Sequence, residues 1–168
     1  MEIERTQAVC FTGHRTIPAD ETENLKSLLK TTIEIYIRRD FKYFITGGAV
    51  GFDSIAAECI AQLKQEGHNI YHILALPCRD QTTKWNDLRD LAFYKRMLGA
   101  ADEVVYTSTM YSKGCMHTRN RFMVDNSSVC IAYKTSEKGG TAYTCKYAKK
   151  EGLQIVNLGE IVTQLEFC

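Results

Sequence analysis

A glycine-rich motif in the first third of the chain is suited to hold a phosphate group. The motif TGGAVGFDS brings Gly47, Gly48 and Gly51 together just before a helical pattern. Glycines let the backbone turn tightly, and the first turn of a helix adds unpaired N–H donors and a positive dipole end. The motif therefore predicts a phosphate-binding turn, although it matches neither GxGxxG nor a P-loop. The alternative is a plain glycine turn in which Asp53 or Ser54 caps the helix.

Two other motifs add cations and polar side chains. FTGHR contains Gly13, which permits a close backbone approach, and Arg15, which can form a bidentate pair with a phosphate. The neighbouring His14 is either a solvent-facing loop residue or a catalytic group, and solvent exposure is the more common role. Further along, MHTRNRFMVD predicts a helix on which Arg119 and Asn120 either line a ligand crevice or face solvent.

Two more segments lie where expected strands end. The sequence KGGT contains Gly139, Gly140 and Thr141, which either supply a second set of backbone donors or form a loop that Thr141 caps. Gln81 and Trp85 follow the third expected strand. At that position we expect them to form a pocket wall or a surface on which a nucleobase stacks. For Trp85 we favour the core, because a single tryptophan at helical spacing usually packs there.

The elements that must position these residues alternate along the chain. Apolar runs predict strands at 8–12, 43–46, 70–77, 103–106, 129–133 and 154–157. Helical spacing predicts helices at 25–37, 55–63, 85–98, 115–126 and 141–151. Nearly continuous apolar strands alternating with helices are typical of a parallel sheet covered on both faces. The expected fold is α/β, a Rossmann-like doubly wound parallel sheet with three α/β/α layers and one domain over residues 1–168.

In such a sheet the ligand crevice lies beyond the carboxyl ends of the strands, where the strand order reverses. All the motifs above fall at such ends, so we expect them to converge. The glycines at 47, 48 and 51 would hold a phosphate, and Arg15 and Arg119 would neutralise its charge. Asp53 would accept a hydrogen bond from a ribose hydroxyl, because a carboxylate opposes a phosphate. The segment 139–141 would close the other side.

The overall composition restricts the function classes. The 168 residues carry 21 Lys and Arg against 20 Asp and Glu, so no broad basic field for wrapping duplex DNA is expected. The seven cysteines form no CxxC pair and no two are closer than fifteen residues, which predicts free thiols, not disulfides or a metal site. We find neither an apolar leader nor a run long enough for a membrane span. A cytoplasmic protein is therefore expected.

Taken together, the motifs resemble those of the YpsA-like family of the SLOG superfamily, which is related to DprA and to the LOG (lysine-decarboxylase-like) proteins. FTGHR, TGGAVGFD, Gln81 with Trp85, RNRFMVD and GGT occur in this order between about Val9 and Ile155. The resemblance implies a Rossmann-like domain that binds a small nucleotide or nucleotide-derived ligand, of which ADP-ribose-like or NAD-like molecules fit best. It implies no required cofactor, and it leaves a homo-oligomer open.

The resemblance also implies two rival functions. LOG-like phosphoribohydrolases carry M-H-x-R-K-x-x-M, and Met116, Arg119 and Met123 match it, with Asn120 in place of Lys. Their P-G-G-x-G-T-x-x-E motif ends in the Glu that serves N-glycosidic cleavage, and Thr144 stands at that position here.

If the chain is an N-glycosidase, Asp53 or Asp125 would have to substitute for that carboxylate. DprA-like proteins carry similar G-S-R, G-x-x-x-G-I-D and R-N-R-I-I motifs, which implies binding of single-stranded DNA. The nearly neutral charge of this chain makes a nucleic-acid partner the less favoured alternative.

Overall fold

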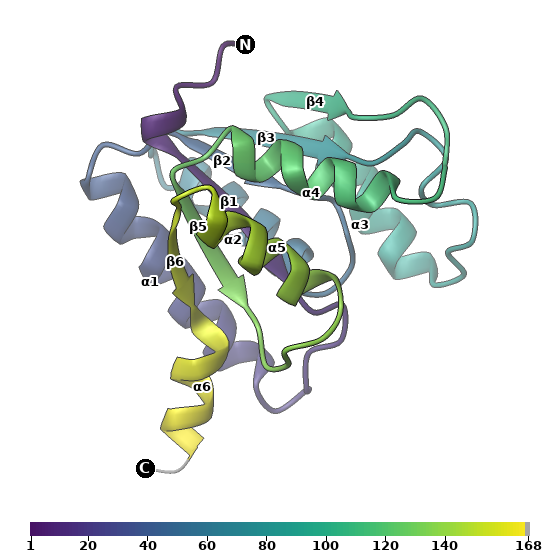
Figure 1. Ribbon diagram of the computed structural model, residues 1–168. Helices are drawn as coiled ribbons and strands as arrows, with labels where there is room; N and C mark the ends of the chain where they lie inside the picture. The colour runs from purple at the N-terminus through teal and green to yellow at the C-terminus, as the bar shows by residue number, and fades with distance from the viewer. Residues whose placement is uncertain (167–168) are drawn as a thin grey trace.

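Six apolar segments form the strands of a single parallel sheet (Figure 1). The computed structural model describes residues 1–166. The strands are β1 (Ala8–Gly13), β2 (Tyr43–Thr46), β3 (Tyr71–Leu76), β4 (Glu103–Tyr106), β5 (Val129–Tyr133) and β6 (Gln154–Asn157). Their spatial order is β4-β3-β2-β1-β5-β6. The chain moves outward from β1 to β4 and then returns to the other side of β1, so the strand order reverses between β1 and β5.

Helices cover both faces of this sheet. They are α1 (Thr22–Arg38), α2 (Phe52–Gln65), α3 (Leu88–Ala100), α4 (Cys115–Asp125), α5 (Gly140–Lys150) and α6 (Leu158–Glu166), and a short 3-10 turn, η1 (Arg5–Gln7), precedes β1. Alternate residues of β1 point to opposite layers: Phe11 packs among residues of α1, α2 and α6, whereas Cys10 packs among residues of α4 and α5. In Figure 1, α4 and α5 lie in front of the sheet. The predicted doubly wound, three-layer α/β fold is confirmed.

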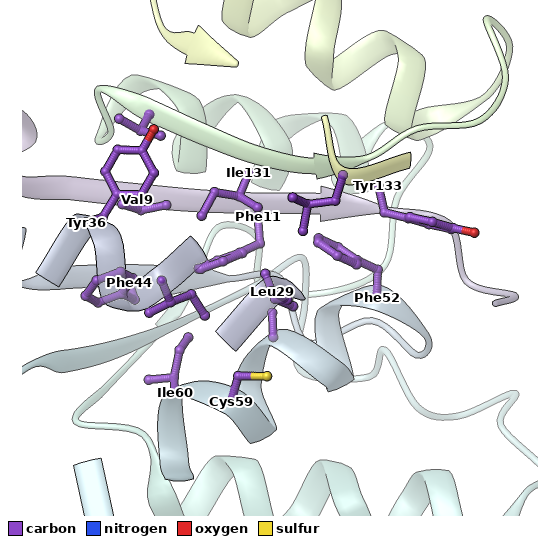
Figure 2. Packing of buried hydrophobic residues seen from close by; sticks show 14 of the residues in the cluster. Val9, Phe11, Leu29, Tyr36, Phe44, Phe52, Cys59, Ile60, Ile131 and Tyr133 are labelled. Atoms are coloured by element: carbon purple, nitrogen blue, oxygen red, sulfur yellow. The ribbon is translucent and has the colours of Figure 1, made fainter. Parts of the chain in front are cut away.

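The face of the sheet that α1, α2 and α6 cover carries the main aromatic core, and this core reaches the end of β1 (Figure 2). Phe52, the first residue of α2, stacks on Tyr133 of β5 with ring centroids 6.0 Å apart. A Cβ on Gly13 would lie 2.4 Å from the Phe52 ring, so only glycine fits there. The core therefore fixes the carboxyl end of β1 against the start of α2.

Two predictions about the helices need correction. Trp85 was expected inside the third helix, but α3 begins at Leu88, and Leu88 itself is 79% exposed. Asp87 caps α3 by accepting hydrogen bonds from the N–H groups of Arg89 and Asp90, which starts the helix after Trp85. The core of α3 consists of its buried residues, Tyr94 and Met97.

The second correction is the helix α6, which sequence patterns did not predict. It begins directly after β6 without an intervening glycine or proline turn. The side chain of Asn157 accepts a hydrogen bond from the N–H of Gly159 at 3.1 Å and one from Lys134 at 2.9 Å. This capping of the first turn, and the burial of Leu158 and Val162 on α1 and β5, stabilise a helix too short for a clear periodicity.

Cysteines at apolar positions are buried, as predicted: the six within the described residues are all free thiols. Cys168 lies outside the described residues. Among residues 1–166, no helix is both long and apolar enough to cross a membrane. The same residues contain no cluster of three or more His, Cys, Asp or Glu side chains placed to hold a metal ion.

A buried histidine makes the stability of this fold depend on pH. His72 of β3 shares a 2.8 Å hydrogen bond with the Thr46 hydroxyl, and burial, helped by the charge of Lys64, lowers its pKa to about 4. The native state keeps His72 neutral, whereas the unfolded chain takes up the proton below about pH 6.5. The contribution of neutral His72 to the unfolding free energy is therefore fully present above pH 6.5 and is lost as the pH falls toward 4.

We expect the unfolding free energy to drop by about 2 kcal/mol between pH 7.5 and 5 because of His72 alone. Urea unfolding at the two pH values measures this drop. The variant His72→Gln should lack this part of the pH dependence, whereas the exposed control His117→Gln should retain it. Equal pH dependence in all three proteins would contradict the assignment.

Candidate ligand-binding site

A crevice of about 240 Å³ opens beyond the carboxyl ends of β1 and β5, where the strand order reverses. Segments far apart in the sequence meet there: the end of β1, the β2–α2 turn, the first turns of α4 and the start of α5. The crevice is lined by Phe11, Thr12, Gly13, His14, Arg15, Ala49, Asp53, Met116, Arg119, Asn120, Gly140 and Thr141. Eight of these residues were predicted from the sequence as nucleotide-binding; their function remains a prediction.

Two opposite charges are buried under the crevice, Asp53 of α2 and Arg119 of α4, which are 6% and 5% exposed. Nη1 of Arg119 donates to the carbonyl oxygen of Gly47, and Oδ2 of Asp53 accepts from the N–H of Ala49 at 3.3 Å. A Cβ on Gly47 would lie 2.7 Å from both Nη1 and Oδ2. The β2–α2 turn is thus held between the two charged groups and has room only for glycine.

Burial and mutual attraction act in opposite directions on this pair. Burial raises the pKa of Asp53, and the charge of Arg119 and hydrogen bonds from the backbone of Ala49 and Gly47 act against that rise. Burial lowers the pKa of Arg119, and the charge of Asp53 opposes it. Each charge favours the ionised form of the other, but burial has the larger effect on both, so the pKa of Asp53 stays raised and that of Arg119 stays lowered.

The glycines predicted to bind phosphate lie beneath the crevice, outside its lining. Gly48, with φ +67°, would place a Cβ 2.4 Å from the Leu76 side chain. Gly51, with φ +83°, would place one 2.2 Å from the carbonyl oxygen of Arg15. Both positions require glycine because the β2–α2 turn lies too close to Leu76 and to the Arg15 backbone to leave room for a side chain. Gly51 precedes α2, and Asp53 accepts from Ala49 instead of capping this helix.

The groups free to contact a ligand come from other segments. The exposed guanidinium of Arg15 makes no hydrogen bond or ion pair within residues 1–166. Asn120 accepts from Nε of Arg119 at 2.8 Å through its Oδ1, which leaves its amide N–H groups for a ligand. Helix α5 begins at Gly140 with no side-chain cap, so the unpaired N–H groups of its first turn and its positive dipole end lie at the crevice. Thr141 is the second residue of α5 and not its cap.

His14 connects two of the loops that border the crevice. Its Nε2 accepts from the backbone N–H of Thr135 at 2.9 Å, and its ring packs edge-on against Tyr133 at 5.8 Å. Burial lowers the pKa of His14, which favours the neutral ring that this hydrogen bond requires. His14 thus positions the β5–α5 loop against the end of β1.

A second cavity of about 510 Å³ adjoins the crevice and shares Arg15 and Met116 with it. Gln81 and Trp85 line this cavity, and Trp85 packs edge-to-face on Tyr94 at 5.4 Å. Sequence reasoning missed Asp80 and Tyr111, which also line it. Both follow the carboxyl ends of strands, β3 and β4, and that position was the available signal.

Besides the three glycines of the β2–α2 turn, Thr144, Asp125 and Gly139 also lie outside the crevice. Thr144 is buried, and its hydroxyl donates to the carbonyl oxygen of Gly140 at 2.9 Å. Asp125 is the last residue of α4, at the opposite end of that helix from Met116, and it accepts from the Tyr147 hydroxyl at 2.8 Å. Gly139 precedes α5 and lines a separate groove along α5 and β6. Of the two carboxylates proposed as substitutes, only Asp53 lines the crevice.

A doubly wound sheet with its crevice at the strand-order reversal, bordered by these motifs, places the chain among Rossmann-like SLOG proteins. The YpsA family model, described as "YspA SLOG family", matches residues 10–160, and the chain belongs to this family. Protein YoqJ, derived from the SPbeta prophage of Bacillus subtilis strain 168, is 35% identical over 139 residues, covering 75% of this chain and 81% of YoqJ. A UPF0398 protein of Listeria innocua is 28% identical over 144 residues, covering 80% and 78%.

Two solved structures of DNA processing protein A share the fold. The protein from Streptococcus pneumoniae matches with a TM-score of 0.62 at 13% identity over 89% of this chain. This chain spans about half, 49%, of that protein. The protein from Helicobacter pylori, described for its single-stranded DNA binding mode, matches with a TM-score of 0.56 at 17% identity, covering 94% of this chain and 79% of that one. At these identities the likeness shows a common fold.

The buried pair gives a prediction about stability. Replacing Arg119 by Met should destabilise the protein by about 3–5 kcal/mol in urea unfolding, because the Asp53 carboxylate is left buried without its counter-charge. Adding Asp53→Asn to that variant should recover part of the loss, so the two effects should not be additive. The control Arg121→Met lies on the same helix, where the exposed guanidinium of Arg121 donates to the Tyr143 hydroxyl. Strict additivity of the two changes would show that the charges are not coupled.

Proposed function

We propose that the crevice binds a nucleotide-derived small molecule of the ADP-ribose or NAD type, and that binding needs no further cofactor. The observation that carries the proposal is Arg15, an exposed cation that makes no hydrogen bond or ion pair within residues 1–166. It stands over a crevice that also contains Asp53 and the uncapped start of α5. Family membership supports the same ligand class, because the motifs shared with YpsA-like proteins surround this crevice.

The crevice combines donors for an anion with one acceptor for a hydroxyl. Arg15, the amide of Asn120 and the first N–H groups of α5 are all donors, and such groups bind phosphate oxygens well. Asp53 is the one carboxylate in the lining. A carboxylate repels a bare phosphate but accepts hydrogen bonds from sugar hydroxyls, so the pattern favours a sugar phosphate over an inorganic anion.

The geometry favours binding without turnover. At the position where LOG-like hydrolases carry their catalytic Glu, this chain has Thr144, whose hydroxyl is used within α5. An N-glycosidase would have to rely on Asp53, and the oxygen Oδ2 of that residue already holds the β2–α2 turn. Chromatography for a free base released from NAD or nucleoside monophosphates separates the two functions. Base release that disappears in Asp53→Asn would favour the hydrolase.

Single-stranded DNA is the second candidate ligand, because the fold is shared with a DprA described for binding it. A DNA-binding protein releases counterions, so its affinity should fall with salt along a log–log slope of about −0.7 per phosphate contact. Flat, weak binding of an oligonucleotide at low salt would exclude this candidate.

Removing the free cation tests the proposal directly. In calorimetric titrations with ADP-ribose, Arg15→Ala should weaken binding by about 10–150-fold, since a hydrogen bond to a charged group contributes about 1.5–3 kcal/mol. Arg89→Ala is the matched control, because Arg89 is an exposed arginine outside the crevice that pairs with Asp87. Unchanged affinity in Arg15→Ala, or no binding of ADP-ribose by the unmodified protein, would refute the assignment.

A further inference from the structure

We propose that the 510 Å³ cavity next to the crevice is a subsite for a planar ring, and that it holds the nucleobase of the ligand. This inference rests on the proposed function and specifies it by assigning the base of the ligand to this cavity. The cavity has about twice the volume of the crevice and shares Arg15 and Met116 with it. In a ligand of the ADP-ribose type, the diphosphate joins a ribose on one side to an adenosine on the other. A diphosphate held at Arg15 would therefore place the ribose in the crevice and the adenine in the neighbouring cavity.

Two aromatic side chains and a thioether give this cavity its apolar surfaces. The ring of Trp85 packs edge-to-face against Tyr94, with an angle of 74° between the ring planes. Tyr94 belongs to the core under α3. Tyr111 comes from the β4–α4 loop and is 62% exposed. Met116 completes the wall that borders Arg15. Aromatic rings and methionine form apolar surfaces on which a flat heterocycle can stack whatever its substituents.

The loops that carry these side chains are tied together. The backbone N–H of Tyr111 donates to Oδ1 of Asp80 at 2.8 Å, which joins the β4–α4 loop to the β3–α3 loop. Nε2 of Gln81 donates to the carbonyl oxygen of Gly48 at 3.2 Å, which joins the β3–α3 loop to the turn beneath the crevice. The cavity is therefore built on the same turn that Asp53 and Arg119 hold in place.

Gln81 also carries an unusual feature for a structural residue. It is buried, yet its Oε1 has no hydrogen-bond donor within residues 1–166. Buried acceptors without a donor are rare because they destabilise the fold, and they concentrate where function requires a polar group. The lining of the cavity thus combines apolar ring surfaces with the amide-bearing Gln81 and the cation of Arg15, a composition typical of nucleotide pockets.

The single tryptophan of the chain makes the proposal directly measurable. Trp85 is the only source of indole fluorescence, so a base that stacks in the cavity should change the emission. We expect ADP-ribose to quench it, and ribose 5-phosphate, which has no base, to leave it unchanged. In calorimetry Tyr111→Ala should weaken ADP-ribose binding at least fivefold and leave ribose 5-phosphate binding unaffected. Tyr143→Ala, an exposed tyrosine of α5 outside this cavity, is the matched control.

The outcomes separate this inference from the proposed function. ADP-ribose binding that depends on Arg15 but leaves both the Trp85 emission and the Tyr111→Ala affinity unchanged would overturn the ring subsite and leave the proposed function standing. Equal losses of both ligands in Tyr111→Ala would overturn the subsite too, because they would show a general effect on the crevice. Failure of the unmodified protein to bind either ligand would overturn both proposals.

Discussion

The buried pair of Asp53 and Arg119 is the interaction on which the crevice depends. Arg119 reaches from α4 across the end of the sheet to the carbonyl oxygens of Gly47 and, at 3.5 Å, Ala75. Asp53 reaches back from α2 to the N–H of Ala49. One charge pair thus joins two helices on opposite faces of the sheet to the ends of β2 and β3. Because neither charge is stable alone at this depth, the walls of the crevice are fixed before any ligand arrives.

The two arginines of the crevice consequently have different tasks. The guanidinium of Arg119 is used by backbone carbonyls and by Asn120, so its role is to position other groups. Arg15 has no such partner and remains available to an anion. Since Asp53 balances Arg119, the crevice carries about one unpaired positive charge. This balance agrees with the proposed small phosphate ester as ligand, and the net charge of +1 for the whole chain provides no broad basic surface for a polyanion.

The sequence predicted the sheet, its helices and the convergence of distant motifs, because apolar periodicity and parallel topology determine where strand ends meet. The structural roles of Gly48 and Gly51 were harder to predict. A glycine required by contact with Leu76 or with the Arg15 backbone looks the same in a sequence as one that binds phosphate. The start of α3 and the existence of α6 depended on caps at Asp87 and Asn157, and the cavity at Tyr111 depended on a contact between two loops. Such tertiary contacts leave no periodic pattern.

The start of α5 shows how one substitution changes what a shared scaffold can do. A Glu at the position of Thr144 would place a negative charge one turn from the positive end of the helix and partly neutralise it. Thr144 adds no charge, and its hydroxyl is satisfied by the Gly140 carbonyl. The dipole of α5 therefore acts undiminished on the crevice. Thr144 also lacks the carboxylate that would activate water, so under the proposed function this one residue favours binding of a phosphate over hydrolysis.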